Sequence, residues 1–224
     1  MTSYDAAYQQ IRERVQAAAR RAGHAVQLLA VSKTKPASAI RALAALGQTA
    51  FGENYVQEAR AKQRELTDLD LEWHLIGPLQ SNKCRDVAQH FDWLHSLDRP
   101  KLVPLLEAAR AEGMPPLNVL IQVNIDDETS KAGCAPDEVS ALAATIATAP
   151  RLRLRGLMAI PEPSPDADRR RIAFERMRAL FEQMRAEHPD ADTLSMGMSD
   201  DFEQAIAHGA TMVRIGSALF GARV

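Results

Sequence analysis

The stretch Leu117-Asn-Val-Leu-Ile-Gln-Val-Asn-Ile125 is almost continuously apolar. Such a run is expected for a strand of a parallel sheet that is covered on both faces. Seven other short segments have strand character, and helical patterns separate them: residues 27–33, 49–54, 72–77, 93–98, 152–160, 193–198 and 212–216. The starts of the eight segments lie about 26 residues apart, which is a spacing typical of consecutive βα units.

Between these segments the hydrophobic period changes to that of an amphipathic helix. The clearest apolar stripe comprises Phe174, Met177, Leu180, Phe181 and Met184, and an extra helix before the first strand presents Ala7, Ile11, Val15 and Ala18. One leading helix and eight βα units predict a single (β/α)8 TIM barrel, with residues 1–224 as one domain. The alternative is an open doubly wound sheet. That fold usually carries a glycine-rich first turn, whereas the loop here reads Ser32-Lys-Thr-Lys-Pro36.

Composition narrows the class of protein further. The 224 residues are 46% hydrophobic and 25% charged, which excludes collagen, coiled-coil and disordered chains. A net charge of −2 argues against nucleic acid or an anionic membrane as a partner. Cys84 and Cys134 lie far apart in the sequence, so neither a disulfide framework nor a metal site is expected. No signal peptide or membrane-length apolar run is evident, and we expect a cytoplasmic protein.

In a barrel of this kind, functional groups gather at the C-terminal ends of the strands. Lys33 closes the first strand, and period-two alternation places it on the same face as Leu29 and Val31. An ammonium in an apolar interior has a lowered pKa, so more of it is the neutral amine that attacks aldehydes. The alternative is a lysine that extends into solvent or pairs with a carboxylate.

The last two strands lead into candidate phosphate-binding loops. Gly216 allows close approach of the backbone to an anion, and Ser199 and Ser217 supply hydroxyl donors. The alternative is helix capping, with Asp200 and Glu203 as a capping-box-like pair. Asn54, after the second strand, either contacts a ligand or caps the next helix.

Arg214 lies two residues before Gly216 and therefore shares its face. A guanidinium inside a barrel needs an acceptor, either a structural carboxylate or a ring nitrogen of a ligand. Together with an amine-reactive lysine and a phosphate loop, it specifies pyridoxal 5′-phosphate better than any one of them alone. An arginine facing the pyridine nitrogen leaves the ring a weaker electron sink than an aspartate does. Single buried histidines such as His74 and His95 are more often core residues than catalytic bases.

Six segments in order closely resemble the pyridoxal phosphate homeostasis protein family: residues 28–36, 51–58, 72–83, 155–160, 195–201 and 213–223. The resemblance implies the barrel of the alanine racemase N-terminal domain, the type III fold of pyridoxal phosphate proteins, with Lys33 as the lysine that binds the cofactor. It also implies cofactor-binding positions for Asn54, Ser199, Arg214, Gly216 and Ser217, and places Met158 and His74 on motifs that line the pocket. Lys131 is either a second, exchangeable amine or a surface lysine.

The resemblance implies a protein that holds pyridoxal phosphate as a lysine aldimine and surrenders it, without established catalysis. Apo-enzymes are candidate recipients, no metal is expected, and we expect a monomer. The alternative is a small racemase-like enzyme, which needs a second acid/base group on the other face of the cofactor. Racemases of this barrel type take that group, a tyrosine, from a further domain, whereas this chain ends at Val224 and its tyrosines are Tyr4, Tyr8 and Tyr55. A Schiff-base aldolase is a third possibility, but it gives Arg214 no role.

Overall fold

The computed structural model describes residues 3–126, 132–162, 164 and 166–221. Eight parallel strands form a closed barrel in the order β1 to β8, and β8 pairs with β1 through Leu28 and Val213. The strands are β1 (Gln27–Val31), β2 (Ala50–Glu53), β3 (Glu72–Leu75), β4 (Trp93–Leu97), β5 (Leu117–Gln122), β6 (Leu152–Met158), β7 (Thr193–Ser195) and β8 (Met212–Ile215). The predicted (β/α)8 architecture is therefore confirmed.

Each strand ends one to three residues earlier than the sequence pattern predicted. Lys33, for example, lies in a turn beyond the last residue of β1, Val31. The pattern overshoots because residues past the last ladder hydrogen bond keep the alternation of the strand while their backbone turns toward the helix. The residues between the observed and the predicted end of each strand are the ones that reach the C-terminal mouth of the barrel.

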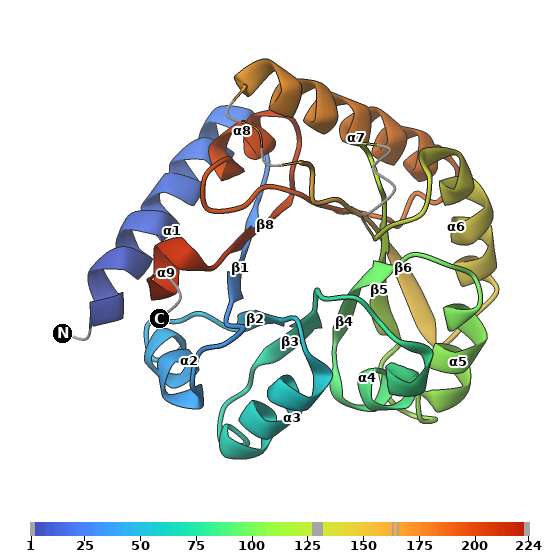
Figure 1. Cartoon of the computed structure of the whole chain (residues 1–224), viewed down its shortest axis with the longest axis horizontal. Helices are drawn as coiled ribbons and strands as arrows, with labels where there is room; N and C mark the ends of the chain where they lie inside the picture. Colours follow the sequence, from blue (N-terminus) through green and yellow to red (C-terminus); the bar gives the residue numbers. More distant parts are fainter. Residues whose placement is uncertain (1–2, 127–131, 163, 165, 222–224) are drawn as a thin grey trace.

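Helices surround the barrel, as Figure 1 shows. They are α1 (Ser3–Ala22), α2 (Ala37–Ala44), α3 (Val56–Glu65), α4 (Cys84–His90), α5 (Leu102–Ala109), α6 (Val139–Ala147), α7 (Ala167–Glu187), α8 (Phe202–Ala207) and α9 (Ser217–Phe220). The predicted leading helix is α1, and it packs against α8 and α9 with Ile11, Val15 and Ala18 buried. Within the described residues, no helix is long and apolar enough to cross a membrane.

The lower half of the barrel interior is filled by an apolar layer. Its members come from six strands and are almost fully buried: Leu29, Ala50, Trp93, Leu120, Met158 and Met212. Five of these side chains are large and Ala50 is small, and together they fill the space where residues from different strands meet in a barrel core. The layer closes the N-terminal half of the barrel, so space for a ligand remains at the C-terminal ends of the strands.

Candidate functional site

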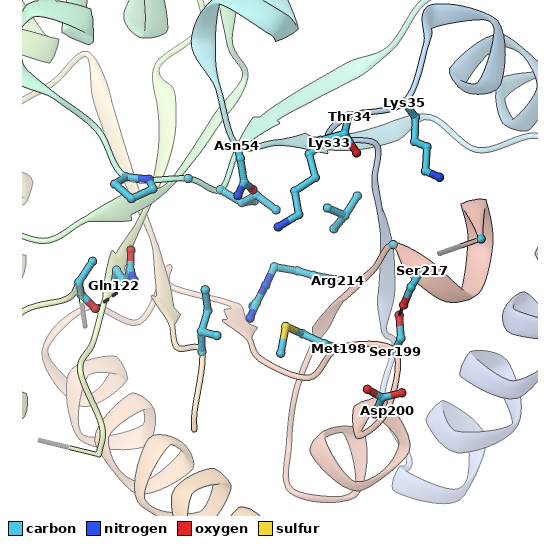
Figure 2. Close-up of a pocket in the computed structure, with 18 residues that line it drawn as sticks. Lys33, Thr34, Lys35, Asn54, Gln122, Met198, Ser199, Asp200, Arg214 and Ser217 are labelled. Carbon is cyan, nitrogen blue, oxygen red and sulfur yellow. Dashed lines mark hydrogen bonds between the residues drawn. The ribbon is translucent and has the colours of Figure 1, made fainter. Parts of the chain in front are cut away.

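A cavity of about 640 Å³ opens at the C-terminal ends of the strands. Six of the eight predicted cofactor-binding residues line it: Lys33, Asn54, Ser199, Arg214, Gly216 and Ser217. Figure 2 shows the side chains of Lys33 and Arg214 pointing into the same space, with Asn54 beside Lys33. Residues far apart in the sequence therefore meet in one cavity, and its volume lies in the range of small-molecule sites.

Lys33 is carried by a strained turn between β1 and α2. The next residue, Thr34, has a φ of 65°, a conformation that a β-branched side chain rarely adopts. The turn is closed by a hydrogen bond from the Lys35 amide to the Ser32 carbonyl, at 3.0 Å. Lys33 itself is half-buried, so its amine lies at the boundary between the barrel interior and the open mouth.

A buried ion network holds this turn from below. The ammonium of Lys62, on α3, donates to the Ser32 carbonyl at 2.8 Å and to carboxylate oxygens of Glu53 and Glu58 at 2.7 Å each. The Ser32 hydroxyl donates to Glu53, and the Thr34 amide donates to Glu58, both at 2.5 Å. Ser32 and Thr34, the two neighbours of Lys33 in the sequence, are thus both hydrogen-bonded to this network of charged side chains.

Glu53 is fully buried, and burial raises its pKa above the ordinary value, although Lys62 and Ser32 act in the opposite direction. Removing a charge from water is costly unless it is paired and hydrogen-bonded. Lys62, which is only 5% exposed, supplies the countercharge at this site. The network is therefore a structural element of the wall that carries Lys33.

The two predicted phosphate-binding serines lie side by side at the start of α9. The Ser217 hydroxyl donates to Ser199 Oγ at 3.1 Å, and the Ala218 amide donates to the same oxygen at 3.5 Å. Lys35 Nζ donates to the Phe220 carbonyl at 3.1 Å, and so holds the other end of this short helix. Hydroxyls and backbone amides at a turn into a helix are suitable donors for an anion.

Arg214 lies on the cavity floor and is 4% exposed. Its Nη1 donates to Ser195 Oγ at 2.7 Å, and its Nη2 donates to the Ala159 carbonyl at 2.8 Å. Burial lowers the pKa of Arg214 to about 10, with a small opposing effect of Asp201, so the group stays a cation at neutral pH. These two acceptors are neutral, and a guanidinium has five donors, so it can still donate to an acceptor in the cavity.

Two predicted residues, His74 and Met158, lie outside the lining. Met158 belongs to the apolar layer, and His74 is fully buried beneath the cavity, where it bonds to His95. Both side chains point inward, as their motifs indicated, but their strand positions are too deep to reach the mouth. Lys131 lies outside the described residues.

The capping alternatives are not supported. Helix α3 begins at Val56 with Tyr55 as its N-cap, so Asn54 is a lining residue and not a cap. The capping-box pair expected of Asp200 and Glu203 is also wrong, because Glu203 pairs with Arg14 on α1 at 3.0 Å. Asp200 lines the cavity, whereas the Asp201 carboxylate accepts from the Met198 amide.

The sequence did not indicate several of the lining residues, of which Gln122 is a polar example, or the ion network. Gln122 lines the cavity from β5, and its amide donates to the Ala132 carbonyl at 3.1 Å. A polar residue two positions after the buried Leu120 in an otherwise apolar strand was the available signal. Lys62 gave only a weak signal, because a lysine on a helix is normally exposed.

Comparisons with known proteins identify the family. Residues 7–224 match the alanine racemase N-terminal domain family. The chain is 57% identical to the pyridoxal phosphate homeostasis protein of Pseudomonas aeruginosa, over 95% of this chain and 91% of that protein. It is 54% identical to the protein of the same name from Escherichia coli K12, over 96% and 94% of the two chains. The chain belongs to the pyridoxal phosphate homeostasis protein family.

Solved structures agree with this membership. PipY of Synechococcus elongatus without pyridoxal phosphate is 39% identical, with a TM-score of 0.89, over 98% of this chain and all of that chain. PipY with pyridoxal phosphate bound is 40% identical, with a TM-score of 0.83, over 93% of this chain and 99% of that chain. Alanine racemase of Corynebacterium glutamicum shares the fold at 21% identity and a TM-score of 0.67, over 94% of this chain and 60% of that chain.

The donor set of the cavity fits the cofactor after which this family is named. Pyridoxal phosphate presents an aldehyde, a phosphate and a pyridine nitrogen, and it therefore needs an amine, anion donors and one ring partner. The cavity supplies Lys33, the Ser199–Ser217 pair at the start of α9, and the buried Arg214. Lys33 lies in the turn after β1, Ser199 in the loop after β7, Arg214 on β8 and Ser217 at the start of α9, and the barrel brings them to one space.

Proposed function

We propose that this chain binds pyridoxal phosphate in the cavity and acts as one cofactor-binding barrel in pyridoxal phosphate homeostasis. The observation that carries the proposal is the meeting of Lys33, Arg214 and the Ser199–Ser217 pair in a single cavity. Each group alone has a structural explanation. A primary amine, a buried guanidinium with remaining donors and a hydroxyl–amide cluster together match the three ends of this ligand.

The cofactor supplies an aldehyde that primary amines attack. In this proposal the neutral amine of Lys33 condenses with that aldehyde, releases one water molecule and holds the cofactor covalently. Ser199, Ser217 and the amides around Gly216 bind the phosphate. Arg214, which stays protonated, donates to the pyridine nitrogen and leaves that nitrogen without a proton. Asn54 borders the ring beside Lys33, as its place in Figure 2 allows.

The open mouth of the barrel supports a carrier role. Lys33 is half-buried and its turn lies at the mouth, so water or a second amine can reach the covalent bond and displace the cofactor. We take apo-enzymes that need pyridoxal phosphate as the recipients. The proposed carrier works as a monomer in the cytoplasm and catalyses no reaction of its own.

The racemase-like alternative needs a second acid/base group across the cavity from Lys33. In the described part of the chain, no tyrosine lines the cavity. Tyr55 follows Asn54 directly, but it is 61% exposed and lies at the start of α3. This arrangement favours binding and release over proton transfer on both faces of a bound substrate.

Titration and transfer experiments test the proposal. Wild-type protein, Lys33→Ala and the exposed control Lys101→Ala are loaded with pyridoxal phosphate, gel-filtered and assayed for retained cofactor. We expect retention by the wild type and the control, loss in Lys33→Ala, and passage of the retained cofactor to an apo-enzyme. A wild type that retains none contradicts the binding proposal. Amino-acid racemisation that is lost in Lys33→Ala contradicts the carrier role.

A further inference from the structure

A chain of hydrogen bonds crosses the barrel interior below the cavity and ends at Arg214. Glu72 Oε1 lies 2.7 Å from His74 Nε2, and His74 Nδ1 lies 2.9 Å from His95 Nε2. His95 Nδ1 lies 3.5 Å from Ser195 Oγ, which in turn accepts from Arg214 Nη1 at 2.7 Å. Four side chains thus link the cavity floor to a carboxylate.

This chain connects opposite walls of the barrel. Glu72 and His74 belong to β3, His95 to β4, Ser195 to β7 and Arg214 to β8. In the closed order from β1 to β8, strands β3 and β4 face β7 and β8 across the interior. His74, His95 and Ser195 have no exposed surface, whereas the Glu72 side chain is 39% exposed. The chain therefore runs from the N-terminal end of the barrel to the cavity floor at the other end.

Both histidines are neutral in this environment. Burial lowers the pKa of His95 well below its ordinary value, and the charge of Arg214 acts in the same direction. Burial also lowers the pKa of His74, although Glu72 and Asp92 oppose the shift. For Glu72, burial acts to raise the pKa, but the hydrogen bonds that its carboxylate accepts, from His74 first and then from Gln27, act in the opposite direction, and the net shift is downward, so the carboxylate is ionised near neutral pH.

These states fix the direction of every hydrogen bond. An ionised carboxylate only accepts, so His74 Nε2 carries a proton and donates to Glu72. Neutral His74 then accepts at Nδ1 from His95 Nε2, and His95 Nδ1 accepts from the Ser195 hydroxyl. Ser195 Oγ accepts from Arg214, which only donates. Each internal group donates one bond and accepts one, and the chain runs from cation to anion without a conflict.

We propose that Ser195, His95 and His74 are positioning residues for Arg214: as a one-directional hydrogen-bond chain, they fix the guanidinium on the cavity floor and link it to its countercharge, Glu72. The inference rests on the proposed function, in which Arg214 donates to the pyridine nitrogen. Two further contacts hold the rings: His74 stacks on Trp93 with ring centroids 5.2 Å apart, and the planes of His74 and His95 lie at 65°.

The alternative is that these polar groups only fill the barrel. Three variants separate the two interpretations. Ser195→Ala removes the link to Arg214, His95→Phe keeps a ring of similar volume, and Leu120→Met changes the fully buried apolar layer without touching the chain. Pyridoxal phosphate affinity, the visible spectrum of the bound cofactor and urea unfolding are measured for each variant, alone and combined with Arg214→Ala.

We expect Ser195→Ala and His95→Phe to weaken cofactor binding roughly tenfold and to shift the visible absorption maximum in the direction of the Arg214→Ala spectrum. In the Arg214→Ala background, neither change should weaken binding further, because the group that the chain positions is gone. Leu120→Met should alter unfolding alone. Unchanged affinity and spectrum in both chain variants, or additive losses with Arg214→Ala, overturn the inference.

A measurement without cofactor keeps the inference separate from the proposed function. Nitrogen-15 NMR of the histidine rings in the ligand-free protein should show His74 and His95 neutral near neutral pH, each protonated at Nε2. A proton on Nδ1 of either ring overturns the chain direction even if the cofactor binds. Failure of the wild type to bind pyridoxal phosphate, with both tautomers as expected, contradicts the proposed function and leaves the chain in place.

Discussion

Two buried polar networks hold the two basic side chains on which the proposed function rests, and they are built from opposite kinds of groups. The turn that carries Lys33 is held by the ion pairs of Lys62 with Glu53 and Glu58. Arg214 is held by a chain whose internal members are neutral. The first network lies between the barrel and α3, and the second lies inside the barrel.

The difference follows from what each of the two side chains, Lys33 and Arg214, does in the proposed function. Lys33 needs a fixed backbone and an amine that reaches the cavity, so its turn is held by hydrogen bonds that join residues 32 and 34 to the charged groups of Lys62 and Glu58. Arg214 needs a fixed side chain, and it already brings a charge into the interior. Neutral partners hold the guanidinium without adding a second buried charge, which would carry its own desolvation cost.

Breaking the ionic network should have the largest effect on stability. Lys62→Met leaves the buried Glu53 carboxylate without its countercharge, and removing one partner of a buried pair costs about 3–5 kcal/mol. Urea unfolding near neutral pH measures the loss, with Lys101→Met as the exposed control. The double variant Glu53→Gln, Lys62→Met should recover most of the stability. A loss below about 1 kcal/mol for Lys62→Met contradicts the account.

The neutral network predicts a pH dependence. His95 is neutral in the folded protein because its pKa lies well below the ordinary value, whereas in the unfolded chain it binds a proton below about pH 6.5. Below about pH 6.5 the unfolded state therefore holds more protons than the folded state. The contribution of neutral His95 to the unfolding free energy is complete above about pH 6.5 and is lost as the pH falls below it. For His95 alone, we expect a loss of about 1 kcal/mol in unfolding free energy between about pH 7.5 and 5.5.

His95→Phe is the matched variant for this dependence. It removes the titrating group, so the unfolding free energy should depend less steeply on pH over the same window. The difference in slope corresponds to about one proton fewer taken up on unfolding. Urea unfolding at several pH values gives both slopes. Equal slopes in the wild type and in His95→Phe show that His95 is not a neutral, buried base.

The smallest effect concerns the strained turn. Thr34→Gly removes the steric cost of a β-branched residue at a φ of 65° and should raise the unfolding free energy by about 1 kcal/mol. The amide of residue 34 still donates to Glu58, so the ionic network stays intact. Urea unfolding detects the gain. A loss of stability means that the turn stores no strain for the network to overcome.

Much of the fold was predictable because it follows local patterns. Apolar strands and helical stripes repeat along the chain, so the eight strands and the leading helix α1 lie where the sequence predicts them. Lys33, Arg214 and the serine pair were also predictable, since the fold brings strand ends together. Their roles toward a cofactor stay predictions.

The two networks were not predictable, because their partners are paired by tertiary structure. Ser195 and His95 are 100 residues apart, and no local pattern connects them. Lys62 resembles any surface lysine of an amphipathic helix until α3 packs against the turn at Ser32. Buried polar contacts depend on the register and tilt of whole elements, which hydrophobic periodicity does not specify.

Borohydride reduction of the cofactor-loaded protein, followed by peptide mapping, tests the central claim most directly. Reduction fixes pyridoxal phosphate on the amine that holds it, and fragmentation separates Lys33 from its neighbour Lys35. The account predicts a label on Lys33 in the wild type and in a Lys35→Arg control, and no label at this turn in Lys33→Ala. A label on Lys35, or a loaded protein that borohydride leaves unlabelled, would contradict the account.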